Sequence, residues 1–284
     1  MSNLPLISFR NVSFGYEKNL PTIIRDINLD IFEGDFVALI GQNGAGKTTM
    51  AKHINGILKP TKGEVTVRGK LTSDYKRDEL AKVVGYCYQN PDHQIFSQTV
   101  EKEIAYGPKA IGLSPAEVQE RVKDALHLVD LEEKRQLHPS LLGRGERQRL
   151  AVASILAMGA SILVIDEPTT GLDYAGITRI MNLLRTWNEK MKVTIIIITH
   201  DIPMVADYVP RTIIMAQGQI LKNAPTPEVL TDFALLKMAA VKPLQVTRVS
   251  ERLGILNADN RIITVRNLFQ VLSNLKNEES AEVK

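Results

Sequence analysis

The sequence contains little cysteine and almost no excess of charge of either sign. Cys87 is the one cysteine among 284 residues, which excludes an internal disulfide and any multi-cysteine metal site. A reducing compartment is therefore expected. Lys and Arg total 35 against 32 for Asp and Glu, and no basic stripe is visible. We therefore expect no nucleic-acid partner.

Long hydrophobic runs are also missing. The densest apolar segments, SILVI and VTIIIIT, fall far short of the roughly 20 residues that a membrane-spanning helix needs. The first residues, MSNLPLISF, lack the basic leader and apolar core of a signal peptide. Hydrophobic residues nevertheless make up 44% of the chain, enough for a sizeable core. A folded protein is expected, and any membrane role has to come through partners.

What the sequence does contain is an alternation of short β-rich runs with longer helical patterns. This order predicts an α/β fold with a largely parallel sheet. The predicted strands of this sheet are 36–40, 161–165, 193–198 and 211–221, with helices after Lys47, Pro115, Gly145 and Tyr174. The segments 7–16, 23–32 and 63–69 alternate apolar and polar residues more cleanly, which predicts an antiparallel β subdomain.

Two further regions divide the chain. Between about 90 and 160 helical periodicity replaces strands, which predicts an inserted helical subdomain. Residues 231–284 are predicted to form a small C-terminal accessory unit, with a frayed charged tail over 276–284.

The stretch GQNGAGKTT follows the strand 36–40 directly and precedes a helical run. It matches the phosphate-binding pattern G-x-x-x-x-G-K-[ST] from Gly41 to Thr48, in the strand–loop–helix context that this pattern requires. Backbone N–H groups freed by the glycines converge on phosphates, Lys47 reaches the β and γ oxygens, and the Thr48 hydroxyl can ligate magnesium. The sequence predicts a nucleotide site here.

Three side chains at strand ends complete the predicted site. The strand SILVI ends in Asp166, which can hold magnesium, and Glu167, which can polarise an attacking water. His200 ends the most β-branched run, where a parallel sheet opens its ligand crevice. The alternative for Asp166 and Glu167 is that they are two solvated loop acids, and the alternative for His200 is that it is a histidine packed in the core. Gln89, where a strand gives way to the helical region, can sense magnesium or water.

The segment SLLGRGERQRLAVAS, residues 140–154, places Arg144 between two glycines just before an apolar helical run. It resembles a helix N-terminus suited to an anion, yet nothing nearby in the sequence supplies one.

Together these motifs resemble the ATP-binding cassette (ABC) ATPases over about residues 4–230. The resemblance implies a RecA-like P-loop core that binds ATP and Mg²⁺, with Glu167 and His200 as catalytic residues and Asp166, Thr48 and Gln89 at the metal. The implied ATP-binding residues are Tyr16, Gly41, Asn43, Gly44, Ala45, Gly46, Lys47, Thr48 and Thr49. Tyr16 matches the aromatic residue that stacks on adenine, although an edge-strand tyrosine is the alternative.

The resemblance also explains the segment around Arg144. In such cassettes the signature of one subunit closes over ATP bound by another, so the anion comes from a partner, and the D-loop with Asp173 lies at the same junction. The family pattern Leu-Ser-Gly-Gly-Gln stands here as Leu142, Gly143, Arg144, Gly145 and Glu146. The missing serine hydroxyl represents a charge-assisted hydrogen bond of about 1.5 to 3 kcal/mol. A weakened signature favours a heterodimer with a second cassette, with a homodimer as the alternative.

Residues 88–113 resemble more closely the ATPase subunits of energy-coupling factor (ECF) transporters, importers of vitamins and transition-metal ions. This implies that Gln94, Ile95 and Phe96 receive a helix of an integral membrane coupling subunit at the cytoplasmic face of the cell membrane. A substrate-binding membrane subunit would be contacted indirectly. The resemblance also implies that the accessory segment 231–284 contributes to dimerisation. A packed helical core is the alternative for these residues. Another ABC transporter, or an ABC ATPase of DNA repair or translation, is the alternative function.

Overall fold

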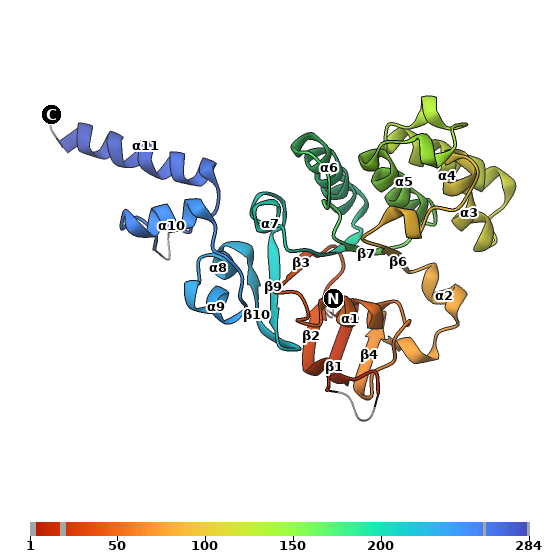
Figure 1. Cartoon of the computed structure of the whole chain (residues 1–284), viewed down its shortest axis with the longest axis horizontal. Coiled ribbons are helices and arrows are strands. Elements are labelled where there is room, and N and C mark those ends of the chain that lie inside the picture. The colour runs from red at the N-terminus through yellow and green to blue at the C-terminus, as the bar shows by residue number, and fades with distance from the viewer. Residues whose placement is uncertain (1–3, 18–20, 258–259, 283–284) are drawn as a thin grey trace.

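The computed structural model describes residues 4–17, 21–257 and 260–282 and confirms the predicted α/β fold. A six-stranded sheet forms its centre, in the order β10-β9-β3-β8-β7-β6 (Figure 1). The pairs β9–β3, β3–β8, β8–β7 and β7–β6 are parallel. The strands are β3 (Phe36–Ile40), β6 (Val84–Cys87), β7 (Ile162–Asp166), β8 (Thr194–Ile198), β9 (Arg211–Ala216) and β10 (Gln219–Pro225).

The predicted strand 211–221 is wrong in one respect, because it is a hairpin rather than one strand. β9 and β10 pair antiparallel across Gln217 and Gly218, which have φ angles of 48° and 79°. Two consecutive residues at positive φ are typical of the tight hairpin turn whose twist matches that of the flanking strands. The Gly218 α-carbon also lies against the backbone of Ile23, so a Cβ there would meet the Ile23 oxygen at 2.3 Å.

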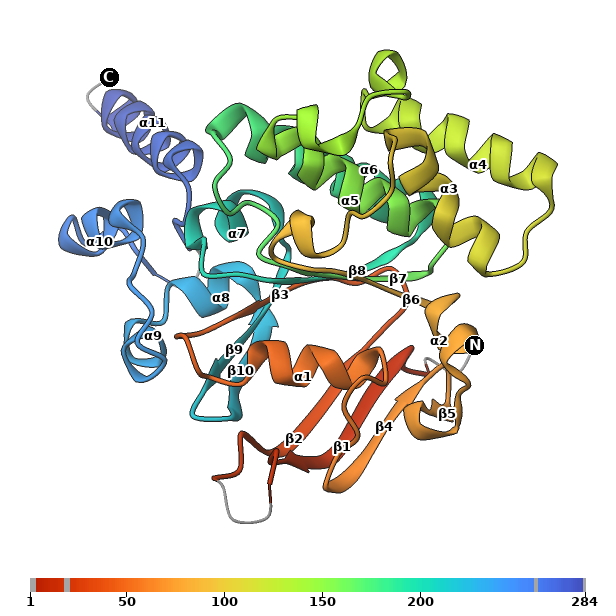
Figure 2. The same cartoon turned by 45° about the vertical axis from the view of Figure 1, so that its right-hand side comes forward.

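A second, antiparallel sheet has the order β2-β1-β4-β5, as expected for the first part of the chain. Its strands are β1 (Ile7–Phe14), β2 (Ile24–Ile31), β4 (Lys62–Val67) and β5 (Lys70–Leu71). Helix α1 (Lys47–Ile54) lies between the two sheets (Figure 2). Met50, Ala51 and Ile54 pack with residues of both sheets in one core cluster, so the P-loop helix is held on two sides.

Residues of α6 (Tyr174–Met191), α7 (Ile202–Tyr208), α8 (Thr226–Leu230) and α9 (Phe233–Met238) pack in a second core cluster, on the other face of the central sheet. Trp187 of α6 is 1% exposed within the core cluster on this face. Because both faces of the sheet are covered, every residue of β3, β7 and β8 is buried. Burial on two sides explains why these strands have continuous apolar sequences.

The helical subdomain consists of α3 (Val100–Ala110), α4 (Pro115–Leu128) and α5 (Arg144–Ala157), with a core of its own. A short helix, α2 (Arg77–Ala81), precedes β6. Helix α4 begins where its sequence predicts, because Ser114 and Glu117 form a capping box: the Glu117 carboxylate accepts from Ser114 N at 2.8 Å.

The C-terminal region continues through α10 (Gln245–Arg252) and α11 (Val265–Glu282), which lie apart from the sheets (Figure 1). The core of the cassette extends past residue 230, because Leu235, Leu236 and Ala239 of α9 are buried in it. The tail predicted to be frayed, 276–284, is assigned to α11 as far as Glu282; 283–284 lie outside the described residues. Glu, Lys and Ala are good helix formers, which favours a helical tail. Extending an existing helix also requires no new nucleus.

Among the helices in the described part of the chain, none has the length and apolar character needed to cross a bilayer.

Candidate nucleotide-binding site

A cleft of about 500 Å³ opens at the carboxyl ends of β3, β7 and β8. This is the edge at which parallel sheets bind ligands, because loops and helix N-termini converge there. The cleft brings together most of the predicted site residues: Tyr16, Asn43, Gly44, Gly46, Lys47, Thr48, Thr49, Gln89, Asp166, Glu167 and His200.

The loop between β3 and α1 has the geometry of a phosphate cradle. Gly41, Gly44 and Gly46 have φ angles of 145°, 83° and 96°, which side chains with a Cβ rarely adopt. A Cβ at Gly41 would lie 2.2 Å from the Met215 carbonyl oxygen, and one at Gly46 would lie 2.7 Å from Ile24. Gly44 has open space. Backbone conformation therefore requires all three glycines, and packing requires Gly41 and Gly46 in addition.

Lys47, the first residue of α1, is buried and curls back over this loop. Its Nζ donates to the carbonyl oxygens of Gly41 at 2.8 Å and Gln42 at 3.0 Å. Burial lowers the pKa of Lys47, and the nearby carboxylates of Glu167 and Asp166 oppose this shift. The ammonium group is thus held where a loop of N–H donors meets two acids.

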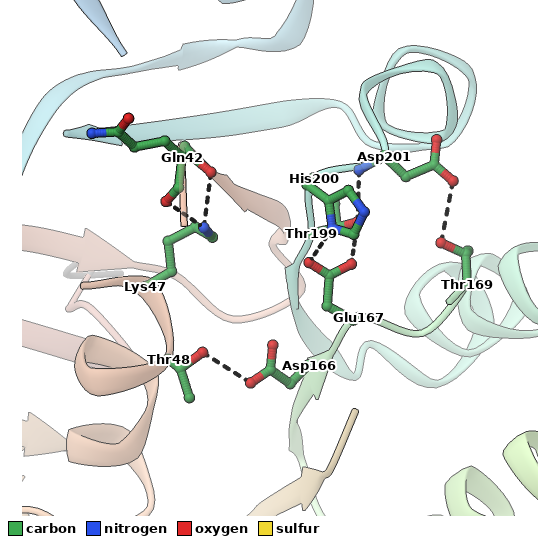
Figure 3. A network of polar contacts seen from close by, with 10 residues as sticks. Gln42, Lys47, Thr48, Asp166, Glu167, Thr169, Thr199, His200 and Asp201 are labelled. Carbon is green, nitrogen blue, oxygen red and sulfur yellow. Dashed lines mark hydrogen bonds and ion pairs between the residues drawn. The ribbon is translucent and has the colours of Figure 1, made fainter. Parts of the chain in front are cut away.

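Thr48 and Asp166 bridge the two halves of the cleft. Thr48 Oγ1 donates to Asp166 Oδ2 at 3.0 Å (Figure 3). The Tyr86 hydroxyl donates to the same oxygen at 3.3 Å. Burial raises the pKa of Asp166, against the lowering effect of these two hydrogen bonds. A hydroxyl and a carboxylate oxygen this close are hard ligands of the kind Mg²⁺ prefers, so the donor set fits magnesium.

Glu167 follows at the turn out of β7, with a φ of 52° that is uncommon for a residue with a side chain. Two neighbours hold its carboxylate: His200 Nδ1 lies 2.6 Å from Oε1, and Thr199 Oγ1 donates to Oε2 at 3.2 Å (Figure 3). Strained backbone clusters at functional sites. Here the turn directs the carboxylate of Glu167 toward the residues that follow β8.

A second pair of hydrogen bonds extends this network away from the cleft. Asp201 N donates to Thr199 Oγ1 at 3.0 Å, and Thr169 Oγ1 donates to Asp201 Oδ2 at 3.2 Å. Asp201 also caps α7 through Met204 N at 3.1 Å. The loop after Glu167 is therefore tied to the loop after β8.

Tyr16 and Gln89 both belong to the cleft lining. Tyr16 is 57% exposed and packs edge-to-face on Phe14, with ring centroids 5.0 Å apart. Gln89 is exposed just beyond β6. Both line the same cavity as Lys47 and Asp166, which is compatible with their predicted roles.

The predicted signature residues form the N-terminus of α5. Gly143 is the N-cap, and Glu146 accepts from its N–H at 3.0 Å while pairing with Lys134. The Arg144 guanidinium lies against Gly171, near Asp173, which caps α6 through Gly176 N at 2.8 Å. Signature and D-loop residues are thus neighbours within one chain, but none of the four signature residues lines the nucleotide cleft.

The three residues predicted to dock a membrane subunit have different environments. Gln94 Nε2 donates to Ala151 O at 2.7 Å, so it anchors its loop on α5. Ile95 is partly buried and packs against two core clusters, which favours the packed-core alternative for this residue. Phe96 is 65% exposed and instead pairs edge-to-face with Tyr106 of α3, with centroids 4.7 Å apart.

Several functional side chains escaped the sequence analysis. They are Tyr86 on Asp166, Thr199 on Glu167, the Thr169–Asp201 pair, Lys134 on Glu146 and Tyr106 beside Phe96. Thr199 and Asp201 are the sequence neighbours of His200, so their place beside a predicted site residue could have identified them. Tyr86, Lys134 and Tyr106 carry no such signal, because only the folded chain brings them to their partners.

A lysine-bearing glycine loop at a helix N-terminus, opposite two consecutive strand-end acids and a histidine, defines a P-loop ATPase. The family model described as ABC transporter matches residues 24–170, about half of the chain. The chain belongs to the ABC transporter family, as the motifs predicted, and it is an ATPase of that family.

Relatives and solved structures agree. The chain is 40% identical over 259 residues to the energy-coupling factor transporter ATP-binding protein EcfA of Methanocaldococcus jannaschii, covering 90% of this chain and 91% of that one. It is 45% identical over 249 residues to a putative ABC transporter ATP-binding protein of Caldanaerobacter subterraneus, covering 88% of this chain but only 43% of the relative. The structure of cbiO1 from Clostridium perfringens, described as part of the ABC transporter complex cbiONQ, matches with a TM-score of 0.76 at 30% identity, over 88% of this chain and 99% of that one.

Proposed function

We propose that this chain is the ATP-hydrolysing subunit of an ECF-type membrane importer for a micronutrient, either a vitamin or a transition-metal ion. The observation that carries the proposal is the contact of Glu167 with His200 beside the Lys47 loop, in a chain that matches a named ECF ATPase over nearly its whole length. The transported solute would not touch this subunit.

ATP would bind along the loop from Gly41 to Thr49, with adenine on Tyr16 and the phosphates at the N-terminus of α1. Magnesium would be held by Thr48 and Asp166, with Gln89 nearby. When bound, the metal neutralises charge on the phosphate oxygens. The fit of this donor set rests on the 3.0 Å spacing between the Thr48 and Asp166 oxygens.

Glu167 would accept the proton of an attacking water, as a general base positioned at the γ-phosphate end of the cleft. His200 and Thr199 each contact one carboxylate oxygen and so orient it. Lys47 would stabilise charge that develops on the transferred phosphoryl group. These roles require only the side-chain positions described above.

Hydrolysis would depend on a second cassette whose signature completes each site. The four signature residues of this chain do not reach its own cleft, which is what an intermolecular role requires. A related ATP-binding cassette, 30% identical, has been solved as a dimer bound to ADP and Pi. A heterodimer is favoured, because Gly143 lacks the hydroxyl of the family pattern.

The membrane subunit would dock on the exposed aromatic pair Phe96–Tyr106, at the cytoplasmic face of the cell membrane. Both rings are more than half exposed, at 65% and 55%, and aromatic residues of this kind form interface anchors. The adjacent Gln94 anchors the loop, so the pair is presented on a fixed support.

The test is co-purification from detergent-solubilised membranes of cells expressing the tagged chain. Integral membrane proteins should accompany the wild type, and Phe96→Ser combined with Tyr106→Ser should release them while ATP binding persists. The matched control is Met191→Ser, which removes a side chain of similar exposure, 61%, from the end of α6. Recovery with DNA or ribosomes instead of membrane proteins would favour the DNA-repair or translation alternative.

A further inference from the structure

The loop between β7 and α6 connects the catalytic acid to a helix that packs on the face of the central sheet. It begins at Glu167 and ends at Asp173, the N-cap of α6. Thr169 anchors this loop through two hydrogen bonds. Its hydroxyl group donates to Asp201, and its carbonyl oxygen accepts from Leu172 N at 3.1 Å. Gly171, in the middle, has a φ of 74° and no side chain of its own to hold it.

Arg144 of α5 fills the space beside Gly171. A Cβ built on Gly171 would lie 2.5 Å from Arg144 Cζ, 2.6 Å from Nε and 2.8 Å from Nη1. The guanidinium group therefore lies directly against the α-carbon of the loop. One residue further along each segment, a Cβ on Gly145 would lie 3.5 Å from Leu172 Cδ2. The start of α5 and the loop thus meet in two adjacent contacts.

The charges around Arg144 do not account for its position. The neighbouring Arg147 pairs with Asp92 at 3.0 Å, and Glu146 pairs with Lys134. Asn90, Asp92 and Thr170 line one small hollow with Arg144 and Gln89, yet Asp92 is directed to Arg147. Arg144 is otherwise exposed, and its guanidinium group lies beside the backbone of Gly171.

We infer that Arg144 is a positioning residue: it braces the loop 168–172 from the helical subdomain and thereby helps to fix Glu167 at the nucleotide. The matching family position is glycine, which would leave this space unfilled. Movement of α5 would pass to the loop through this contact, so the helical subdomain and the catalytic acid would shift together. The inference rests on ATP hydrolysis through Glu167, and not on the solute or membrane subunit of the proposed importer.

The test compares Arg144→Met, which keeps much of the length but loses the planar cation, with Arg121→Met, an exposed arginine on α4. In the purified complex, Arg144→Met should lower kcat about 10-fold with KM for ATP within about twofold, because small displacements of a catalytic group cost rate rather than binding. In the isolated chain, hydrogen exchange at Gly171 and Leu172 should become faster. Arg121→Met should change neither.

A double-mutant cycle tests the contact itself. In the wild-type background, Gly171→Ala should displace the guanidinium group of Arg144. In an Arg144→Gly background the added methyl group has room. The backbone strain from the positive φ at residue 171 is the same in both backgrounds, so it cancels in the cycle. The effects on kcat should therefore be strongly non-additive. Additive effects or unchanged exchange would each overturn the inference, because an Arg144 that acts only on the ATP of a partner subunit would lower kcat without coupling to residue 171. A complex that hydrolyses ATP without transport would refute the importer and leave this test intact.

Discussion

His200 Nδ1 and Glu167 Oε1 lie 2.6 Å apart, although the two residues are 33 positions apart in the sequence. They follow adjacent parallel strands, β8 and β7, whose pairing places Asp166 opposite Ile198. The strand register therefore delivers the acid and the histidine to the same point. Glu167 is buried while the His200 side chain is 66% exposed, so the histidine forms the solvent-facing side of the pair.

Glu167→Gln should abolish most hydrolysis without abolishing nucleotide binding. The amide oxygen can still accept from Thr199, but it cannot take a proton, and general-base catalysis contributes roughly 10²- to 10⁴-fold. Phosphate release should fall by at least 100-fold, while ATP affinity measured by calorimetry stays within a few-fold. Glu189→Gln, on the exposed face of α6, is the control. Undiminished turnover in Glu167→Gln would remove the acid from the mechanism.

Asp166→Asn should stabilise the nucleotide-free chain and eliminate Mg²⁺-dependent hydrolysis. Burial raises the pKa of Asp166 above its unfolded value, so its ionised form disfavours folding once pH exceeds that value. A neutral amide keeps the contacts with Thr48 and Tyr86 and removes this cost. The melting temperature at pH 7 should rise by about 2 to 4 °C per kcal/mol gained. A fall in melting temperature would contradict the assignment of desolvation as the dominant effect.

Gly46→Ala should impair the phosphate loop far more than Gly44→Ala. Both residues have positive φ, so both variants share the backbone strain of about 1 kcal/mol or more. At Gly46 the new methyl would also lie 2.7 Å from Ile24, whereas at Gly44 it meets nothing within 4 Å. Thermal melts and ATP titrations should rank the variants in this order. Equal losses would show that φ alone governs the loop.

His53 should make stability fall on acidification. Burial lowers its pKa below the unfolded value of 6.5, so the unfolded state binds the proton first and folding weakens as pH falls through 6.5 toward the folded pKa. The slope is at most about 1.4 kcal/mol per pH unit. His53→Phe, which keeps the ring contact with Phe14, should flatten the profile between pH 7.5 and 5.5 in urea titrations.

Gly143→Ser should speed ATP turnover of the assembled complex. A side chain has room there, because a Cβ on Gly143 meets only Glu146 Oε2, at 3.7 Å. A charge-assisted hydrogen bond gained in the transition state would raise the rate by roughly 10-fold or more. Gly143→Ala adds the methyl group without the hydroxyl and is the control. If both variants match the wild type, the idea of a weakened signature fails.

The local elements were largely predictable because they depend on short-range patterns. The P-loop glycines, the capped α4 and the buried strands follow from spacing and periodicity alone. The hairpin within 211–221 was not predicted, because glycine is common at such a turn and glutamine is not. Its turn residues are Gln217 and Gly218. The docking and packed-core alternatives for Ile95 stayed open because an apolar residue beside Phe96 can face the core or the solvent, and local sequence does not distinguish the two.

The sequence by itself determined the chemistry: which loop can cradle phosphates, which strands end in acids, and where a serine is missing from the signature. The tertiary structure alone decided which groups touch. Strand register brought His200 to Glu167, packing of β6 beside β7 brought Tyr86 to Asp166, and the approach of α5 set Arg144 on Gly171. The physical reason is that backbone conformation depends on near neighbours in the chain, whereas contacts between distant residues exist only after the hydrophobic core has fixed the sheets and helices in place.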